Sequence, residues 1–510
     1  MAAWSDGYVT DIQYVGRFYS ELAPGALAFA CLRQSVRPPA LGPGSTYLEL
    51  GCGQGFGLNL LAAANPAMQF WGVDFNPAHI ANASRQAAEG GLSNITFEDL
   101  SFAQMLALPD GRLPRFDVIA LHGVYSWVSA ENRGFIVQII DRLLKPGGLV
   151  YVSYNCLPGW SAIASLQRFI QAHVARASGD VGEKIVGALK AALQMQEGGA
   201  RFFQSAPALR ARIEDALKRP SGYLAHEYLN EGAEPLFHAD VARQMEGARL
   251  SFAGSGRSGD DLVHLTAPAP LRAMIQETTD PTWRETLLDY ASNRLFRRDI
   301  FVRGRNPLLP RERNALFEAT PFTLLVPAEQ ASFEAPIPLG VLTGDPKVYR
   351  PIVDALADGP KSFGELARLP QLAGMREGTL LQALGLLVAG RQIHPVAPGG
   401  GAANASTFNR ALIARMSLDE VPTHLAATGP GTAVRLELEE MLAAGAAFRS
   451  ADDTQTTAQQ GWELMARTNR RLRKDGAILQ DQAANTAELA VRIDRFKASK
   501  LPLLRSLGVL

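Results

Sequence analysis

A run of glycines follows an acidic residue at a predicted strand-to-helix turn. Residues 49–55 read Glu-Leu-Gly-Cys-Gly-Gln-Gly; they follow the apolar pair Tyr47-Leu48 and precede a helix predicted from about Phe56. Glycines let a backbone come close to a nucleoside-bearing ligand, because no Cβ blocks the approach. The spacing does not fit the Gly-x-Gly-x-x-Gly of dinucleotide sites, and no Gly-Lys-Ser/Thr follows to make a Walker A sequence. The turn therefore favours a nucleoside-bearing ligand of another kind.

Two further acids are predicted at the ends of the next two strands. Residues 69–75 read as a short buried strand, and Asn76-Pro77 supplies an N-cap and a first-turn proline for the next helix. Because Asn76 is the better cap, Asp74 is free for a ligand, and an acid about 20 residues after Gly53 can accept both ribose hydroxyls. Residues 94–100 read as a third strand that ends at Asp99, with Glu98 as the alternative one residue earlier.

The alternation of strands and helices continues to residue 155. Residues 116–123 and 149–155 read as a fourth and a fifth strand, with a helix between them that Ser129 caps. Five strands separated by helices predict an α/β fold with a parallel sheet and right-handed crossovers. Ligands of such sheets bind at the carboxyl ends of the strands. The residues predicted at that edge are Glu49, Asp74, Asp99, His122, Tyr154 and Asn155.

Composition limits the class of protein. The 510 residues contain 50 Lys and Arg and 50 Asp and Glu, so no net charge favours nucleic acid or an anionic membrane as a partner. The three cysteines are far apart and lack metal-ligand spacing, which is typical of a reducing compartment and predicts no metal site. The chain shows neither a signal-peptide pattern nor an apolar run of membrane-spanning length. These features predict a cytoplasmic protein.

Several stretches of the chain resemble one protein family. The turn at residues 49–55 resembles motif I of class I methyltransferases, which use S-adenosylmethionine (SAM). Residues 72–74 (Gly-Val-Asp), 121–128 (Leu-His-Gly-Val-Tyr-Ser-Trp-Val), 143–148, 153–160 and 223–229 extend the likeness over about residues 6–305. Together they resemble methyltransferases with a methyltransferase regulatory domain, as in the rickettsial-type bacterial protein-lysine methyltransferases that modify an outer-membrane autotransporter protein.

The resemblance implies a domain plan. We expect a Rossmann-like methyltransferase domain over residues 1–305, with a seven-stranded sheet and a helical insertion at about 161–247 over the active-site edge. Residues 249–253 and 297–302 are the candidates for the two antiparallel strands that complete the sheet. Residues 306–400 are expected to hold a strand and a winged-helix-like module, and 401–510 a helical region. The predicted recognition helix near 377–388 carries few cations, which favours packing or protein docking over DNA readout.

The resemblance also assigns the cofactor residues. It implies that Glu49 faces the ammonium group of SAM, that the glycines pass beneath its amino-acid tail and ribose, and that Asp99 meets the adenine amine. The full predicted cofactor set is Glu49, Gly51, Cys52, Gly53, Gly55, Asp74, Phe75, Asp99, Leu100 and His122. Tyr8 and Tyr14 in the N-terminal segment are either pocket residues or ordinary core residues.

The acceptor is less constrained by the sequence. Methyl transfer needs alignment and a dry site more than an acid or base. For the lysine acceptor that the resemblance implies, we expect Tyr154 and Asn155 to align the amine, and Tyr125 and Trp127 to form an aromatic wall. A small-molecule O- or N-methyltransferase is the alternative, with His122 as general base for an oxygen acceptor. A protein that only senses SAM is a third hypothesis.

Overall fold

The computed structural model describes residues 16–219, 221–230, 232–396, 405–416, 421–449, 453–467 and 470–510. Tyr8 and Tyr14 lie outside these residues. None of the described helices is both long and apolar enough to cross a membrane.

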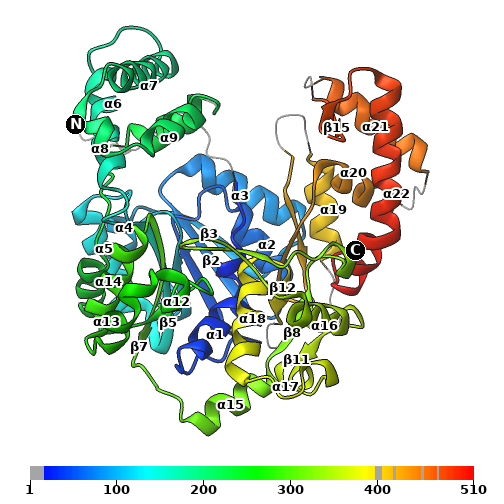
Figure 1. Cartoon of the computed structure of the whole chain (residues 1–510), viewed down its shortest axis with the longest axis horizontal. Helices are drawn as coiled ribbons and strands as arrows, with labels where there is room; N and C mark the ends of the chain where they lie inside the picture. The colour runs from blue at the N-terminus through cyan, green and yellow to red at the C-terminus, as the bar shows by residue number, and fades with distance from the viewer. Residues whose placement is uncertain are drawn as a thin grey trace.

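A seven-stranded sheet forms the centre of the N-terminal half (Figure 1). Its strands, in chain order, are β1 Thr46–Leu50, β2 Gln69–Asp74, β3 Ile95–Asp99, β4 Phe116–Leu121, β5 Leu144–Asn155, β6 Leu250–Ser255 and β7 Phe296–Arg303. The spatial order is β3-β2-β1-β4-β5-β7-β6; β1 to β5 run parallel, and β7 is antiparallel to both β5 and β6. The predicted α/β class, the parallel strands and the final antiparallel pair are confirmed.

Side chains alternate between two cores on the two faces of this sheet, as the period of two in a strand requires. On β1, Tyr47 belongs to one core and Leu48 to the other. The helices of the parallel region are η1 Ser20–Leu22, α1 Pro24–Arg33, α2 Phe56–Ala64, α3 Pro77–Glu89, α4 Phe102–Ala107 and α5 Ala130–Leu143. Helix α5 begins where predicted, because the Ser129 hydroxyl accepts a hydrogen bond from the Asn132 amide.

A helical insertion rises beyond the carboxyl ends of the strands, at the upper left of Figure 1. It consists of α6 Ser161–Val174, α7 Val181–Glu197, α8 Arg201–Ser205, α9 Leu209–Ala216 and α10 Ser221–Tyr228. The insertion has a core of its own, which includes Leu166, Ile185 and Ile213. The chain returns to the sheet through α11 His238–Glu246, and α12 Val263–Thr266, η2 Ala269–Leu271, α13 Arg272–Glu277 and α14 Pro281–Ser292 connect β6 to β7.

Residues 306–396 form a smaller α/β region. Its elements are α15 Pro310–Ala319, β8 Pro321–Leu324, η3 Ala328–Gln330, β9 Glu334–Ile337, β10 Gly340–Thr343, α16 Pro346–Ala357, β11 Lys361–Ser362, α17 Phe363–Ala367, η4 Pro370–Leu372, α18 Glu377–Ala389 and β12 Ile393–Pro395. Strand β8 lies between β11 and β12. Leu380, Leu384 and Leu387 of α18 are buried in the core of this region. The loop that follows the predicted module, residues 397–404, is outside the described residues, and the winged-helix assignment stays a prediction.

The C-terminal region is mostly helical, as expected, and packs on the sheet domain. It contains α19 Ser406–Ala414, β13 His424–Ala427, β14 Thr432–Arg435, α20 Leu438–Phe448, α21 Thr454–Arg467, β15 Arg473–Lys474, β16 Ala477–Ile478 and α22 Gln482–Ser506. Leu60 of α2 shares one continuous hydrophobic core with Leu425, Val434 and Met441. The sheet domain and the C-terminal region therefore share a core, although the predicted domain limits place them in separate domains. Those limits remain a proposal.

Candidate active site

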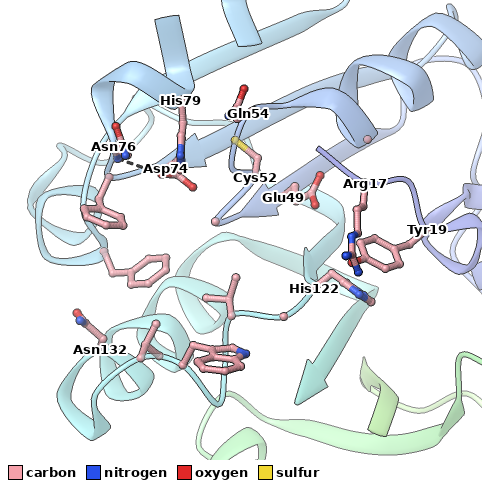
Figure 2. A pocket seen from close by; sticks show the side chains of 18 of the residues that line it. Arg17, Tyr19, Glu49, Cys52, Gln54, Asp74, Asn76, His79, His122 and Asn132 are labelled. Carbon is pink, nitrogen blue, oxygen red and sulfur yellow. Dashed lines mark hydrogen bonds and ion pairs between the residues drawn. The ribbon is translucent and has the colours of Figure 1, made fainter. Parts of the chain in front are cut away.

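A cavity of about 720 Å³ lies where β1, β2, β4 and β5 end (Figure 2). β1 is the middle of the parallel region, with β2 on one side and β4 on the other. Strands β2 and β3 extend the sheet to one side of β1, whereas β4 and β5 extend it to the other. The strand order therefore reverses at β1, and such a reversal is where α/β sheets bind their ligands. The lining residues used below are Arg17, Tyr19, Glu49, Gly51, Cys52, Gln54, Asp74, Phe75, His79, Leu100, Phe102, His122, Trp127, Glu131, Asn155, Glu227 and Phe296.

The glycine turn has a backbone that side chains would disrupt. Gly51, Gly53 and Gly55 have φ angles of 71°, 54° and 70°, in the left-handed region that favours glycine. A Cβ on Gly51 would lie 2.6 Å from Val124 Cγ2, and one on Gly55 would lie 2.4 Å from Ala83 Cβ. Gly51 and Cys52 line the cavity, whereas Gly53 and Gly55 shape the turn without lining it.

Asp74 ties this turn to the start of α3. One carboxylate oxygen accepts a hydrogen bond from the Gly53 amide at 2.9 Å, and the other accepts one from the Asn76 amide at 3.0 Å. His79 Nδ1 lies 3.2 Å from the second oxygen. Asp74 is buried and still lines the cavity, so one side chain both organises the turn and contributes to the cavity wall.

Glu49, at the end of β1, contributes a carboxyl group to the cavity lining. Burial raises the pKa of Glu49 to about 8, and the nearby charge of Asp74 acts in the same direction. Within the described residues, no hydrogen bond or ion pair to this carboxyl group is found. A ligand cation at this position would therefore stabilise the carboxylate.

His122 is a poor base in this setting. Burial lowers the pKa of His122 to about 4; Glu21 opposes that shift and Arg298 adds to it. Its ring lies 3.6 Å from that of Tyr19, centroid to centroid, and Nδ1 is 3.1 Å from the Tyr151 hydroxyl. His122 is thus neutral at physiological pH and sits among aromatic rings at the end of β4.

Two of the predicted acceptor residues are not at the cavity. Asn155 lines it, but Tyr154 points to the opposite face of β5, where its hydroxyl donates to Asp299 at 2.6 Å. Trp127 lines the cavity, whereas Tyr125 is buried and its hydroxyl donates to Gln244 at 2.5 Å. Neither the alignment role expected for Tyr154 nor the aromatic-wall role expected for Tyr125 fits this placement, because alternation along the strand and the turn after β4 direct their side chains into the protein.

The end of β3 also differs from expectation. Asp99 is exposed and is not among the residues that line the cavity, whereas Leu100 and Phe102 are. Glu98, the alternative, pairs with Arg112 at 2.8 Å. The lining here is therefore mostly apolar, with Ser101 as the polar residue.

Sequence reasoning missed several lining residues. Gln54 lies inside the glycine motif, so its position was a usable signal, and His79 is one turn into the helix after Asp74. Arg17 and Phe296 carried no local signal, because they reach the cavity from segments that the fold brings in from outside the parallel strands. Figure 2 shows Arg17 and Tyr19 on the side of the cavity that holds Glu49 and His122.

Family models match both parts of the site. A "Methyltransferase domain" model matches residues 41–200, and a "Predicted methyltransferase regulatory domain" model matches residues 220–303. An uncharacterized protein of Synechocystis is 36% identical over 512 aligned residues, which cover 99% of each chain. The chain belongs to the class I SAM-dependent methyltransferases that carry this regulatory domain.

Rickettsial proteins are among the other relatives of this methyltransferase. A Rickettsia prowazekii protein is 28% identical over 256 residues, which are 50% of this chain and 45% of the relative. The solved structure of Rickettsia typhi PKMT2, in complex with AdoHcy, covers 98% of this chain and 100% of its own, with a TM-score of 0.70 at 19% identity. The methyltransferase therefore shares the fold of PKMT2 over nearly its whole length, including the C-terminal region.

Proposed function

We propose that this enzyme transfers the methyl group of SAM to the side-chain amine of a lysine in a protein. The observation that carries the proposal is the composition of the cavity beyond the glycine turn. Trp127 and Phe296 are aromatic, Glu131 and Glu227 are acidic, and His122 is neutral with a pKa of about 4. Aromatic faces and carboxylates attract an ammonium group, while an oxygen acceptor needs a stronger base.

The cofactor contacts of the proposal follow from the lining. Glu49 would hold the ammonium group, Asp74 the ribose hydroxyls, and Phe75, Leu100 and Phe102 the adenine ring. Leu100 and Phe102 replace Asp99 in that role because they line the cavity. When bound, SAM supplies a methyl group activated by a sulfonium, and its carboxylate would find a cation in Arg17.

The acceptor amine must be neutral when it reacts. An apolar, aromatic surrounding disfavours the charged form of a lysine and so lowers its pKa. Trp127 and Phe296 supply that surrounding, and Asn155, whose side chain lies at the cavity, can hold the amine in line. Glu227 of the insertion also lines the cavity, and its ion pair with Arg212 at 2.8 Å orients its carboxyl group.

Binding of SAM should release close to one proton at pH 7. The Glu49 carboxyl is mostly protonated at that pH because its pKa is raised to about 8, and an ammonium partner favours the carboxylate and lowers that pKa. Titration calorimetry in two buffers of different ionisation enthalpy measures the proton count. Glu49→Gln should bind SAM more weakly and release no proton; an unchanged count in this variant would contradict the role of Glu49.

Asn155→Ala should lower turnover without changing SAM affinity. Loss of an alignment contact acts on kcat, since it removes an interaction made in the transition state. Tyr154→Phe is the matched control, because the neighbouring side chain faces away from the cavity; its kcat should be unchanged while its melting temperature falls. If Tyr154→Phe instead loses turnover and Asn155→Ala does not, the acceptor side is misassigned.

Incubation with methyl-labelled SAM and a lysate of the source cell tests the acceptor class. Label should enter protein bands, and hydrolysis of those bands should yield methyl-lysine. Label confined to low-molecular-weight products would instead support a small-molecule methyltransferase. SAM binding without any transfer would support a SAM sensor.

The three free cysteines, Cys31, Cys52 and Cys156, are in keeping with a proposed cytoplasmic location.

A further inference from the structure

Helix α3 contacts the glycine turn at two neighbouring residues. Asn82 Nδ2 donates a hydrogen bond to Gln54 Oε1 at 2.7 Å, and Gln54 lines the cavity. The next residue, Ala83, packs so close to Gly55 that a Cβ there would overlap it. The position of α3 therefore sets the position of the turn.

The C-terminal region holds the other side of α3. Arg415, which caps α19, donates from Nη2 to Asn82 Oδ1 at 3.2 Å and from Nη1 to Glu89 Oε2 at 2.8 Å. Arg85 donates to the same Asn82 oxygen at 3.0 Å. Below these bonds, Phe408 of α19 packs against Gly90, where a Cβ would lie 2.3 Å from its ring. A guanidinium on α19 thus clamps two residues of α3 at once.

The hydrogen bonds from Arg415 to Asn82 and from Asn82 to Gln54 form a continuous network between the end of α19 and the cavity. With its oxygen occupied by two guanidinium groups, Asn82 must present its NH₂ group to Gln54, and this fixes the orientation of the Gln54 amide at the cavity wall. We propose that Asn82 and Arg415 are positioning residues for the SAM-binding turn, so that the C-terminal region takes part in cofactor binding. This inference rests on the proposed SAM site.

Arg415→Ala should raise the Kd for SAM about threefold to tenfold, the range for loss of a hydrogen bond in a network. Turnover at saturating SAM should change by less than about twofold, since neither Arg415 nor Asn82 lines the cavity. Arg410→Ala is the matched control: it removes a cation from the same helix, where the guanidinium lies over the Phe448 ring rather than on α3. Its Kd should stay at the value of the unchanged enzyme.

A double-mutant cycle separates this coupling from general destabilisation. If the effect passes through Asn82, Arg415→Ala should add little to the Kd of an Asn82→Ala enzyme, whereas independent effects would multiply. Asn82→Asp keeps the oxygen that Arg415 uses but loses the donor that faces Gln54, and it should weaken SAM binding while the thermal transition is retained. Calorimetry of full-length variants gives all these constants.

The outcomes distinguish a failure of the coupling from a failure of the proposed SAM site. A Kd unchanged in both Arg415→Ala and Asn82→Asp, together with weaker binding by Asp74→Ala, would overturn the coupling and leave the SAM site in place. Multiplicative effects in the cycle would also overturn it. Unchanged binding by Asp74→Ala would show that the proposed SAM site itself is wrong.

Discussion

Asp74→Ala should weaken SAM binding by about 1.5–3 kcal/mol, the range for hydrogen bonds to a charged group, which is roughly tenfold to more than a hundredfold in Kd. In the proposed SAM site this carboxylate accepts the ribose hydroxyls, and in the structure it accepts hydrogen bonds from the Gly53 and Asn76 amides. Its removal therefore deletes ligand contacts and releases the turn that lies under the ligand. Isothermal calorimetry measures the change directly.

Asp74→Asn is a milder change at the same position and tests the contribution of the carboxylate charge. The amide keeps the volume and one acceptor oxygen, so its SAM affinity should fall between those of the unchanged protein and Asp74→Ala. Asp110→Ala serves as the control, because that side chain is 97% exposed and its partner Arg142 also bonds backbone carbonyls. Full SAM affinity in Asp74→Ala would remove Asp74 from the site.

Arg297→Met should lower the free energy of unfolding by about 3–5 kcal/mol, as expected when one partner of a buried charge network is removed. Arg297 is fully buried and bonds Asp289 at 2.6 Å, Glu285 at 2.8 Å and Asp299 at 2.9 Å. Methionine fills similar space but leaves these carboxylates without their main cation. Urea denaturation followed by circular dichroism measures the loss.

The control for this change is Arg249→Met. Arg249 pairs with Asp141 at 2.6 Å on the surface, where its side chain is 70% exposed, so its loss should cost less than about 1 kcal/mol. A similar small cost for Arg297→Met would mean that the buried network contributes little.

The same buried network makes the free energy of unfolding depend on pH. Burial raises the pKa of Asp299, but Arg297 and His238 outweigh it and hold that pKa below its usual range. A carboxyl whose pKa is lower in the folded than in the unfolded state stabilises the fold above its unfolded value, and this contribution disappears as the pH falls through the folded value. In Arg297→Met, the part of this contribution that depends on Arg297 should be missing near neutral pH.

The sequence predicted the sheet and the strand ends well because both rest on local patterns. A buried strand, a glycine-rich turn and the acid that ends β2 are each visible within a short stretch of the sequence. The sequence did not show which of Tyr154 and Asn155 faces the cavity. A period of two puts only one of them there, and because both faces of β5 are buried, hydrophobicity does not indicate which one. Sequence patterns also place no residue from a distant segment, which is why Arg17 and Phe296 were missed.

Helix α2 shows a further limit of sequence patterns. Its residues after Gly57 are apolar on almost every side, which predicts burial all round but not the identity of the covering element. Only the tertiary structure shows that β13 and β14 supply this cover, with Asn65 at the end of α2 donating to the Gly431 carbonyl at 3.0 Å.

That shared core has a consequence for biosynthesis. The nascent chain exposes the apolar flank of α2 early, while its covering strands leave the ribosome only after several hundred more residues, an interval of tens of seconds at about 5–20 residues per second. During that time the flank is a site for aggregation or for a chaperone. Because β13 and β14 lie so late in the sequence, α2 can be covered only when translation is nearly complete.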